Sequence, residues 1–92
     1  MKSYVQTYLN YFDLGLQDEI FCEGCMRGGR VDGEGFEIHH IHGRIGEDSD
    51  NIRNLMLLCR DCHTKAHRIL SKDEMQWIHN NVLQGNRKIY LK

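Results

Sequence analysis

Apolar side chains near the start of the chain recur at a helical spacing. Residues 3–14 carry them at i, i+3, i+4 and i+7, and they are Val5, Tyr8, Leu9 and Phe12. This spacing predicts a helix with one apolar face turned to the core. Ser3 followed by Gln6 is typical of a capping box at its start, and Gly15 is expected to end it.

Two more helices are predicted in the second half of the chain, over about 60–70 and over 72–84. Ser71 with Glu74 forms a second capping-box pattern, and Gly85 stands where it can end the last helix. The last helix has its apolar residues on one face: Met75, Ile78 and Val82. We expect the N-terminal helix to pack against this last helix.

Two short segments between these helices favour strands. Residues 36–41 have β-branched and aromatic anchors, and residues 55–58 are a continuous apolar run typical of a buried strand. The polar residues 42–53 between them predict a loop, and the Gly-rich residues 27–35 predict a turn or loop. The tail, 86–92, is expected either to form a short strand or to remain loose. This order of elements predicts the α+β class.

Length and composition indicate a small domain that depends on metal ions. The 92 residues suit one domain over 1–92, with a core at 22–70 and a helix on each side of it. A chain this short buries a limited core, and small domains often rely on a metal or on disulfides. Four Cys and six His favour the metal.

Charge and hydropathy limit where the protein acts and what it binds. The sequence shows neither a secretory signal nor an apolar run that could cross a membrane, so we expect a cytoplasmic or phage-encoded intracellular protein in a reducing compartment. A net charge of −1 means that any nucleic-acid binding has to come from a local patch. The early part of the chain is acidic, through Asp13, Asp18, Glu19 and Glu23. Residues 60–72 are basic, which indicates a solvated helix face or a phosphate-binding one.

The cysteines form two C-x-x-C pairs that lie far apart in the sequence: Cys22 with Cys25, and Cys59 with Cys62. Zinc takes four thiolates in a tetrahedron, and each pair can supply two of them from one tight turn. Gly24 between the first pair suits a turn whose backbone N–H groups face the sulfurs. We therefore predict a closed structural zinc site. Disulfides or a redox pair are the alternative, which the missing secretory signal disfavours.

The histidines indicate a second metal site. His63 and His67 stand four apart on a predicted helix and share a face. A third ligand is needed, and either His39 or His40 can supply it. Adjacent residues on a regular strand point to opposite faces, so one of the two can bind the ion while the other faces the substrate.

Taken in order, these motifs resemble the HNH endonuclease family. The first cysteine pair is followed by Glu37-Ile38-His39-His40-Ile41, a glycine-bearing loop, Asn54-Leu55 before an apolar run, and Cys62-His63 with His67. The resemblance covers about residues 22–67 and implies a ββα-metal core with four-cysteine zinc knuckles.

The resemblance also implies a role for each site residue. His40 matches the general base that activates water, and Asn54 matches the asparagine that orients this base, with Asn51 as a second candidate. His39, His63 and His67 match the ligands of one catalytic divalent metal. Glu37 either contacts one of the metal-binding side chains and holds it in place, or faces solvent.

The implied activity is metal-dependent hydrolysis of DNA phosphodiester bonds, expected as nicking with low sequence specificity. Imidazole ligands suit Zn or Ni, whereas Mg and Mn prefer oxygen, and the residues leave this choice open. Five cations near the loop and the histidine helix are the candidates for contacting the backbone of duplex DNA: Arg44, Arg53, Arg60, Lys65 and Arg68. A larger protein partner could add specificity. The alternative function is a non-catalytic zinc-binding module for nucleic acid or protein, which would need the cysteines but not the histidines.

Overall fold

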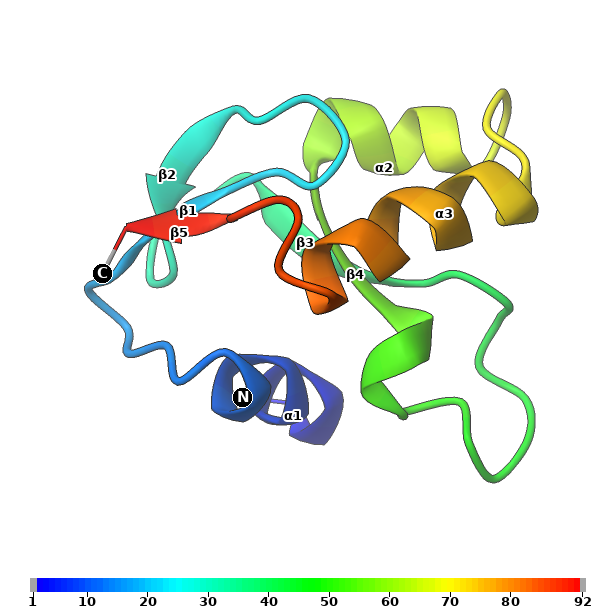
Figure 1. Ribbon diagram of the computed structural model, residues 1–92, viewed down its shortest axis with the longest axis horizontal. Helices are drawn as coiled ribbons and strands as arrows, with labels where there is room; N and C mark the ends of the chain where they lie inside the picture. The colour runs from blue at the N-terminus through cyan, green and yellow to red at the C-terminus, as the bar shows by residue number, and fades with distance from the viewer. Residues whose placement is uncertain (1, 92) are drawn as a thin grey trace.

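The computed structural model describes residues 2–91. This part of the chain contains three α-helices, one 3-10 helix and five strands, joined by loops. In chain order the elements are α1 (Ser3–Tyr11), β1 (Glu19–Phe21), β2 (Gly28–Arg30), β3 (Phe36–His40), the 3-10 helix η1 (Ile52–Asn54), β4 (Leu55–Cys59), α2 (Arg60–Ala66), α3 (Lys72–Leu83) and β5 (Tyr90–Leu91). Figure 1 shows the β3–β4 hairpin near the centre, with α1 and α2 on opposite sides of it and the other strands beside it. The predicted α+β class is confirmed.

The β3–β4 hairpin and α2 form the predicted ββα unit. The two strands are antiparallel, with Phe36 opposite Cys59 and His40 opposite Leu55. Helix α2 begins directly after β4, at Arg60. This order brings the end of β3, with His39 and His40, close to α2, which carries His63 and is followed by His67.

Strand β4 is buried along its whole length and separates two halves of the core. Leu55 and Leu57 pack with side chains of α1, whereas Met56 and Leu58 pack with α2 and α3. This alternation follows from the two-residue repeat of a strand. Each such side chain contributes about 1.5–3 kcal/mol relative to an exposed one, so the apolar run clamps the hairpin between the helices.

The second sheet has the strand order β2-β1-β5 and is antiparallel throughout. The prediction of residues 27–35 as turn or loop is wrong in part, because β2 lies within them. Its glycines are required by packing: a Cβ on Gly29 would lie 2.4 Å from the Phe36 ring. The tail forms strand β5, which is the first of the two outcomes expected for residues 86–92. Met1 and Lys92 lie outside the described residues.

The ends of α1 differ from those predicted. Ser3 is the first helical residue and does not cap the helix. The helix ends before Gly15, at Tyr11, and Asp13 takes the left-handed conformation with φ of 55°. Leu14 N–H donates to Leu9 O at 2.8 Å, which closes the turn, and both side chains are buried in one cluster. An aspartate therefore takes the place that the sequence pattern assigned to glycine.

The last helix has the predicted ends. Ser71 Oγ accepts from the Glu74 N–H at 3.0 Å, and Gly85 follows the helix with φ of 80°. Helix α2 is shorter than the predicted 60–70, since it ends at Ala66. Within residues 2–91, the structure contains no helix with the length and apolar character needed to cross a membrane.

A buried polar network joins the N-terminal and C-terminal helices. Glu23, fully buried after the first knuckle cysteine, accepts from the Tyr8 hydroxyl, the Leu57 N–H and the His79 ring, each at 2.7 Å. The other His79 nitrogen lies 2.6 Å from the Ile52 carbonyl. With Glu23 ionised, both nitrogens face acceptors, an arrangement that favours the doubly protonated, cationic ring.

The charge of His79 is maintained against its burial. Burial disfavours the cation, but the hydrogen bond and charge of Glu23, together with the Ile52 carbonyl, outweigh burial and raise the pKa of His79. The network therefore ties α1, the first knuckle, α3 and η1 together through one buried ion pair.

Candidate metal centres and active site

Three histidines from two elements form one cluster. His39 comes from the end of β3, and His63 and His67 come from α2 and the residue after it. One ring nitrogen from each lies within 4.8 Å of the others. The Nε2 atoms of His63 and His67 are 3.3 Å apart. Two imidazoles bound to one tetrahedral ion at about 2.0–2.1 Å would lie about 3.3–3.4 Å apart, so the cluster fits a metal ion such as zinc.

The surroundings keep this cluster in the form that a metal requires. The Glu37 carboxylate contacts Nδ1 of His63. A carboxylate only accepts, so Nδ1 carries the proton and Nε2 keeps its lone pair for an ion. Burial, followed by the neighbouring His63, His67 and His40, lowers the pKa of His39 to about 4. His39 is therefore neutral at physiological pH. Glu37 both contacts His63 and is 48% exposed to solvent, so the structure does not separate the two roles that the sequence leaves open for it.

The four cysteines form the second cluster, with their sulfurs within 4.8 Å of one another. The sulfurs of Cys25 and Cys59 are 3.6 Å apart. Four thiolates around zinc at about 2.3 Å would lie about 3.8 Å apart, so this set fits a tetrahedral ion. The cysteines are thus positioned to bind a metal ion.

Backbone groups support the sulfurs, as the glycine between the first pair suggested. The N–H groups of Gly24 and Cys59 donate to Cys22 Sγ at 3.3 and 3.2 Å. A side chain at position 24 would crowd this cluster, since a Cβ there would stand 3.0 Å from Cys62 Sγ. Burial raises the pKa of Cys22 and Cys62. Burial also acts on Cys59, but hydrogen bonds from the Cys62 backbone and the neighbouring thiols outweigh it and lower the pKa of Cys59 to about 7.

His40 lies beside the histidine cluster but makes different contacts. Its Nε2 is 2.8 Å from Oδ1 of Asp50, in the loop between β3 and β4. The Tyr4 ring of α1 meets the imidazole edge-on at a centroid distance of 4.6 Å. An open cavity of about 560 Å³ is lined by His40 together with the three clustered histidines. The adjacent residues 39 and 40 therefore serve one cavity through separate contacts.

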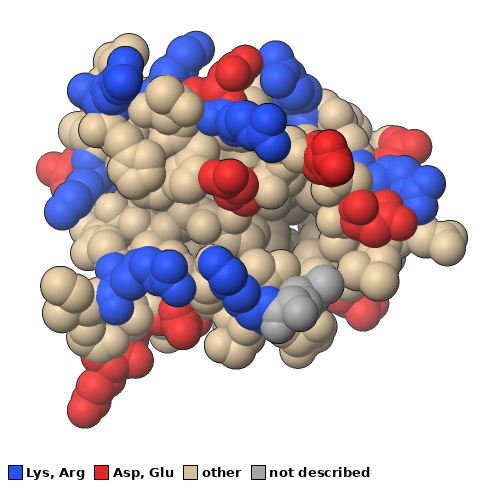
Figure 2. Space-filling model, turned by 180° about the vertical axis from the view of Figure 1, so that it is seen from behind, with Lys and Arg blue, Asp and Glu red and all other residues tan. Residues whose placement is uncertain are grey.

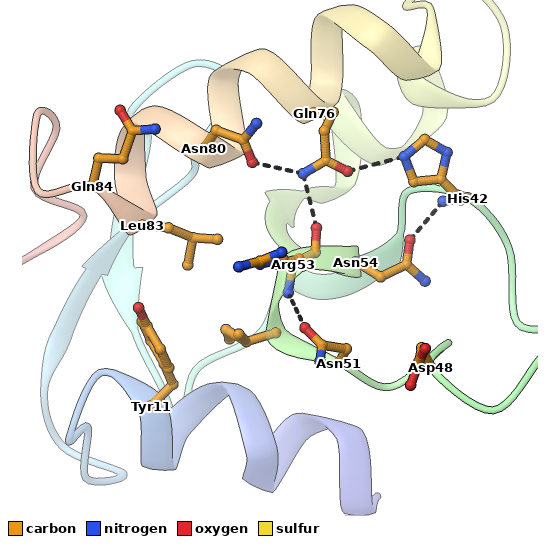
Figure 3. A pocket seen from close by; sticks show the side chains of 11 residues that line it. Tyr11, His42, Asp48, Asn51, Arg53, Asn54, Gln76, Asn80, Leu83 and Gln84 are labelled. Carbon is orange, nitrogen blue, oxygen red and sulfur yellow. Dashed lines mark hydrogen bonds between the residues drawn. The ribbon is translucent and has the colours of Figure 1, made fainter.

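Asn54 is occupied with the loop rather than with the His40 ring. Its Oδ1 accepts from the His42 N–H at 2.8 Å, and its Nδ2 donates to the carbonyls of Gly43 and Ser49 at 3.0 and 2.8 Å. Figure 3 shows Asn54 reaching toward His42 at the edge of a second cavity. Among residues 2–91, the hydrogen bonds of the Asn54 side chain thus go to backbone groups of the loop and not to the His40 ring. Asn51, the other candidate, bonds the Arg53 N–H instead.

The predicted DNA-contacting cations do not all lie together. Arg44 lines the histidine cavity, and its guanidinium stands 5.0 Å above the Tyr4 ring. Lys65 and Arg68 are exposed on and after α2. Arg53 lines the other cavity, in Figure 3, and Arg60 lines a third hollow near β2. Figure 2 shows Lys and Arg side chains above and below the central hollow of the opposite face, with acidic ones among them.

Sequence reasoning missed three residues that line or organise the site. Lys2 and Tyr4 line the histidine cavity from the start of α1, and Asp50 holds His40. Tyr4 and Asp50 stand 36 and 10 residues from His40, outside any motif spacing. The polar, glycine-bearing composition of residues 42–53 was the one available signal, and it indicated a loop without saying which side chain turns inward.

Comparison with known proteins matches the central part of the chain. The sequence model described as HNH endonuclease matches residues 22–68, just over half of the 92 residues. The matched span contains both ligand clusters, His40 and Asn54. No curated protein and no solved structure matches the chain.

Proposed function

Because this chain belongs to the HNH endonuclease family, we propose that it is a metal-dependent endonuclease that hydrolyses phosphodiester bonds of duplex DNA. We assign it nicking of one strand with low sequence specificity. The observation that carries the proposal is the single cavity that His40 shares with His39, His63 and His67. A module that only bound zinc through its cysteines would have no need of that arrangement.

His40 is the general base in this proposal. A neutral imidazole can take a proton from water at neutral pH. His40 lines the open cavity, and although its side chain is only 5% exposed, this role requires water to reach it there. Tyr4 restricts the ring from the α1 side by its edge-on contact.

The three clustered histidines are the proposed ligands of the catalytic ion. An ion there would stabilise the charge that develops on the scissile phosphate and the leaving oxygen. Glu37 holds His63 in the ligand tautomer. The all-imidazole set favours Zn or Ni over Mg or Mn, which prefer oxygen ligands.

The four cysteines take the structural role, with zinc as the proposed ion. Binding energy at such a site is largely folding energy. Cys59 and Cys62 flank the first turn of α2, so an ion there sets the start of the helix that presents His63.

Backbone contacts to DNA are assigned first to Arg44 and Lys2, because both line the cavity of the histidines. Lys65 and Arg68 extend this surface along the helix. Arg53 and Arg60 are more remote and should matter less. Such phosphate contacts position a duplex without reading its sequence, and they weaken with salt.

Supercoiled plasmid tests the proposal directly. Relaxed circles should appear with Zn, Ni, Mn or Mg, and should disappear with chelator and in His40→Ala. His42→Ala is the matched control, since the His42 side chain points to Gln76 across the other cavity. Equal cutting by His40→Ala and the parent would reject the assignment of the base, and no cutting by the parent with any of the four metals would reject the function.

A further inference from the structure

The contact between His40 and Asp50 restricts the chemical form of the proposed base. Nε2 of His40 lies 2.8 Å from Oδ1 of Asp50, and the His40 side chain is only 5% exposed. A carboxylate accepts hydrogen bonds and cannot donate them. Nε2 therefore carries the proton, and neutral His40 has its lone pair on Nδ1.

Nδ1 of His40 is free to meet water. It has no hydrogen-bond partner among residues 2–91. Every buried side-chain nitrogen or oxygen among these residues does have a partner, so Nδ1 is not buried. Nδ1 must then reach solvent. A base needs this form, with one nitrogen held and the other open.

Asp50 is held in place by the loop that Asn54 closes. Asn54 Nδ2 bonds the carbonyl of Ser49, the residue directly before Asp50, and also that of Gly43. Asn54 Oδ1 bonds the His42 N–H two residues after the base. Both ends of the loop are thus fixed by one amide, and the carboxylate that the loop presents is the group that touches His40.

We infer that Asp50 is the positioning residue of His40: it fixes the ring and its Nε2–H tautomer so that Nδ1 faces the attacking water, and Asn54 acts on the base through Asp50. The inference rests on the proposed endonuclease function. It deepens that function by moving the orienting contact from the asparagine to an aspartate of the loop.

Steady-state nicking of plasmid by the zinc-loaded full chain is the first measurement. Asp50→Ala should lower kcat by about 10–100-fold. This is smaller than the rate gain of about 10²–10⁴-fold that a general base supplies, because the base itself remains. KM should not rise, since the carboxylate is not assigned to DNA. Asp50→Glu keeps the carboxylate, and at 53% exposure the side chain has room to adjust, so it should recover most of the lost kcat.

Asp48→Ala is the matched control. It removes the same charge from the same loop, but Asp48 lines the other cavity. Its kcat should equal that of the parent. A kcat for Asp50→Ala equal to the parent's, or an equal fall in both alanine variants, would overturn the inference while leaving the endonuclease function intact.

Nitrogen NMR of the His40 ring is the second measurement and needs no activity. At one fixed pH, the zinc-loaded parent and Asp48→Ala should show Nε2 protonated and Nδ1 bare. Asp50→Ala should show a mixture of tautomers. The tautomer test thus decides the positioning contact even if the parent proves inactive, and an unchanged Nε2–H signal in Asp50→Ala would refute it.

Discussion

The two ligand clusters share α2 but differ in exposure and surroundings. Cys22 and Cys59 are fully buried and Cys62 is 6% exposed, whereas Cys25 is exposed. His39 is buried, His63 is partly buried and His67 is exposed, and all three line an open cavity of about 560 Å³. Cys62 and His63 are consecutive, and successive helical residues point about 100° apart, so one short helix serves both sites. Three of the four cysteines are buried, against one of the three histidines, so the cysteine cluster is the more closed of the two and the histidine cluster the more accessible.

Removing a cysteine should have the largest effect. In Cys59→Ser, loss of a structural zinc would cost on the order of 10 kcal/mol, comparable to the whole stability of a small domain. Circular dichroism at 25 °C should show a chain that is already unfolded, with no cooperative unfolding transition. His63→Ala is the contrast: it should unfold cooperatively and keep one zinc per chain. A well-folded Cys59→Ser without metal would remove the distinction between the clusters.

Breaking the buried pair between the two regions should have the next largest effect. Glu23→Ala removes the buried partner of His79 and the acceptor of the Tyr8 hydroxyl and the Leu57 N–H, which should cost about 3–5 kcal/mol. Because His79 also bonds the carbonyl of Ile52, the first residue of η1, the loop that holds Asp50 should loosen as well. Chemical denaturation measures the loss, and hydrogen exchange of the Asn54 N–H reports on η1. Exchange unchanged in Glu23→Ala would show that the two regions are independent.

The same pair predicts a pH dependence of stability. The pKa of His79 is raised on folding, so its stabilisation is complete below the unfolded value of about 6.5 and is lost as pH rises through the raised folded value. The free energy of unfolding of zinc-loaded protein should therefore fall as pH rises from about 6.5 through the raised pKa. In His79→Gln the decline should be flatter, and an identical slope in both proteins would contradict the assignment of charge.

Glu37→Gln should act on the histidine site alone. The amide can still touch Nδ1 of His63 but holds its tautomer less firmly, and loss of such support typically lowers metal affinity by about 10–100-fold. Titration of zinc-loaded protein with a second equivalent of metal measures this affinity. Thermal unfolding should be unchanged. A shift in unfolding with no change in affinity would assign Glu37 to the fold instead.

The smallest predicted effect is a gain at the cysteine site. Met26 follows the first cysteine pair with φ of 65°, a left-handed conformation that costs a residue with a Cβ about 1–2 kcal/mol. Met26→Gly should raise the free energy of unfolding by about 1 kcal/mol, less the greater entropy of glycine in the unfolded chain. Affinity of the histidine cluster should stay the same. Destabilisation would mean that the Met26 side chain contributes more packing than its partial burial suggests.

Local patterns predicted elements whose causes are local. The apolar run of β4, the Ser71 cap and the helical spacing of His63 and His67 all appear in the structure at the predicted places. Glycine-rich β2 was missed, because its strand form depends on β1 and on the Phe36 ring, which lie elsewhere in the sequence. The end of α1 was misplaced because Asp13 can adopt a conformation that the pattern reserved for glycine.

Within the site, the ligand types and their grouping were evident from the sequence, because metal chemistry fixes the donor atoms and tight turns fix their spacing. The tertiary structure alone decided that Asp50 rather than Asn54 touches His40, and that Tyr4 lies against the base. It also placed Glu23 beside His79, 56 residues away. Glu23 belongs to the acidic segment near the start of the chain, and in the structure it is the buried partner of His79. The physical reason is that hydrogen-bond partners distant in sequence are chosen by packing, which no local period encodes.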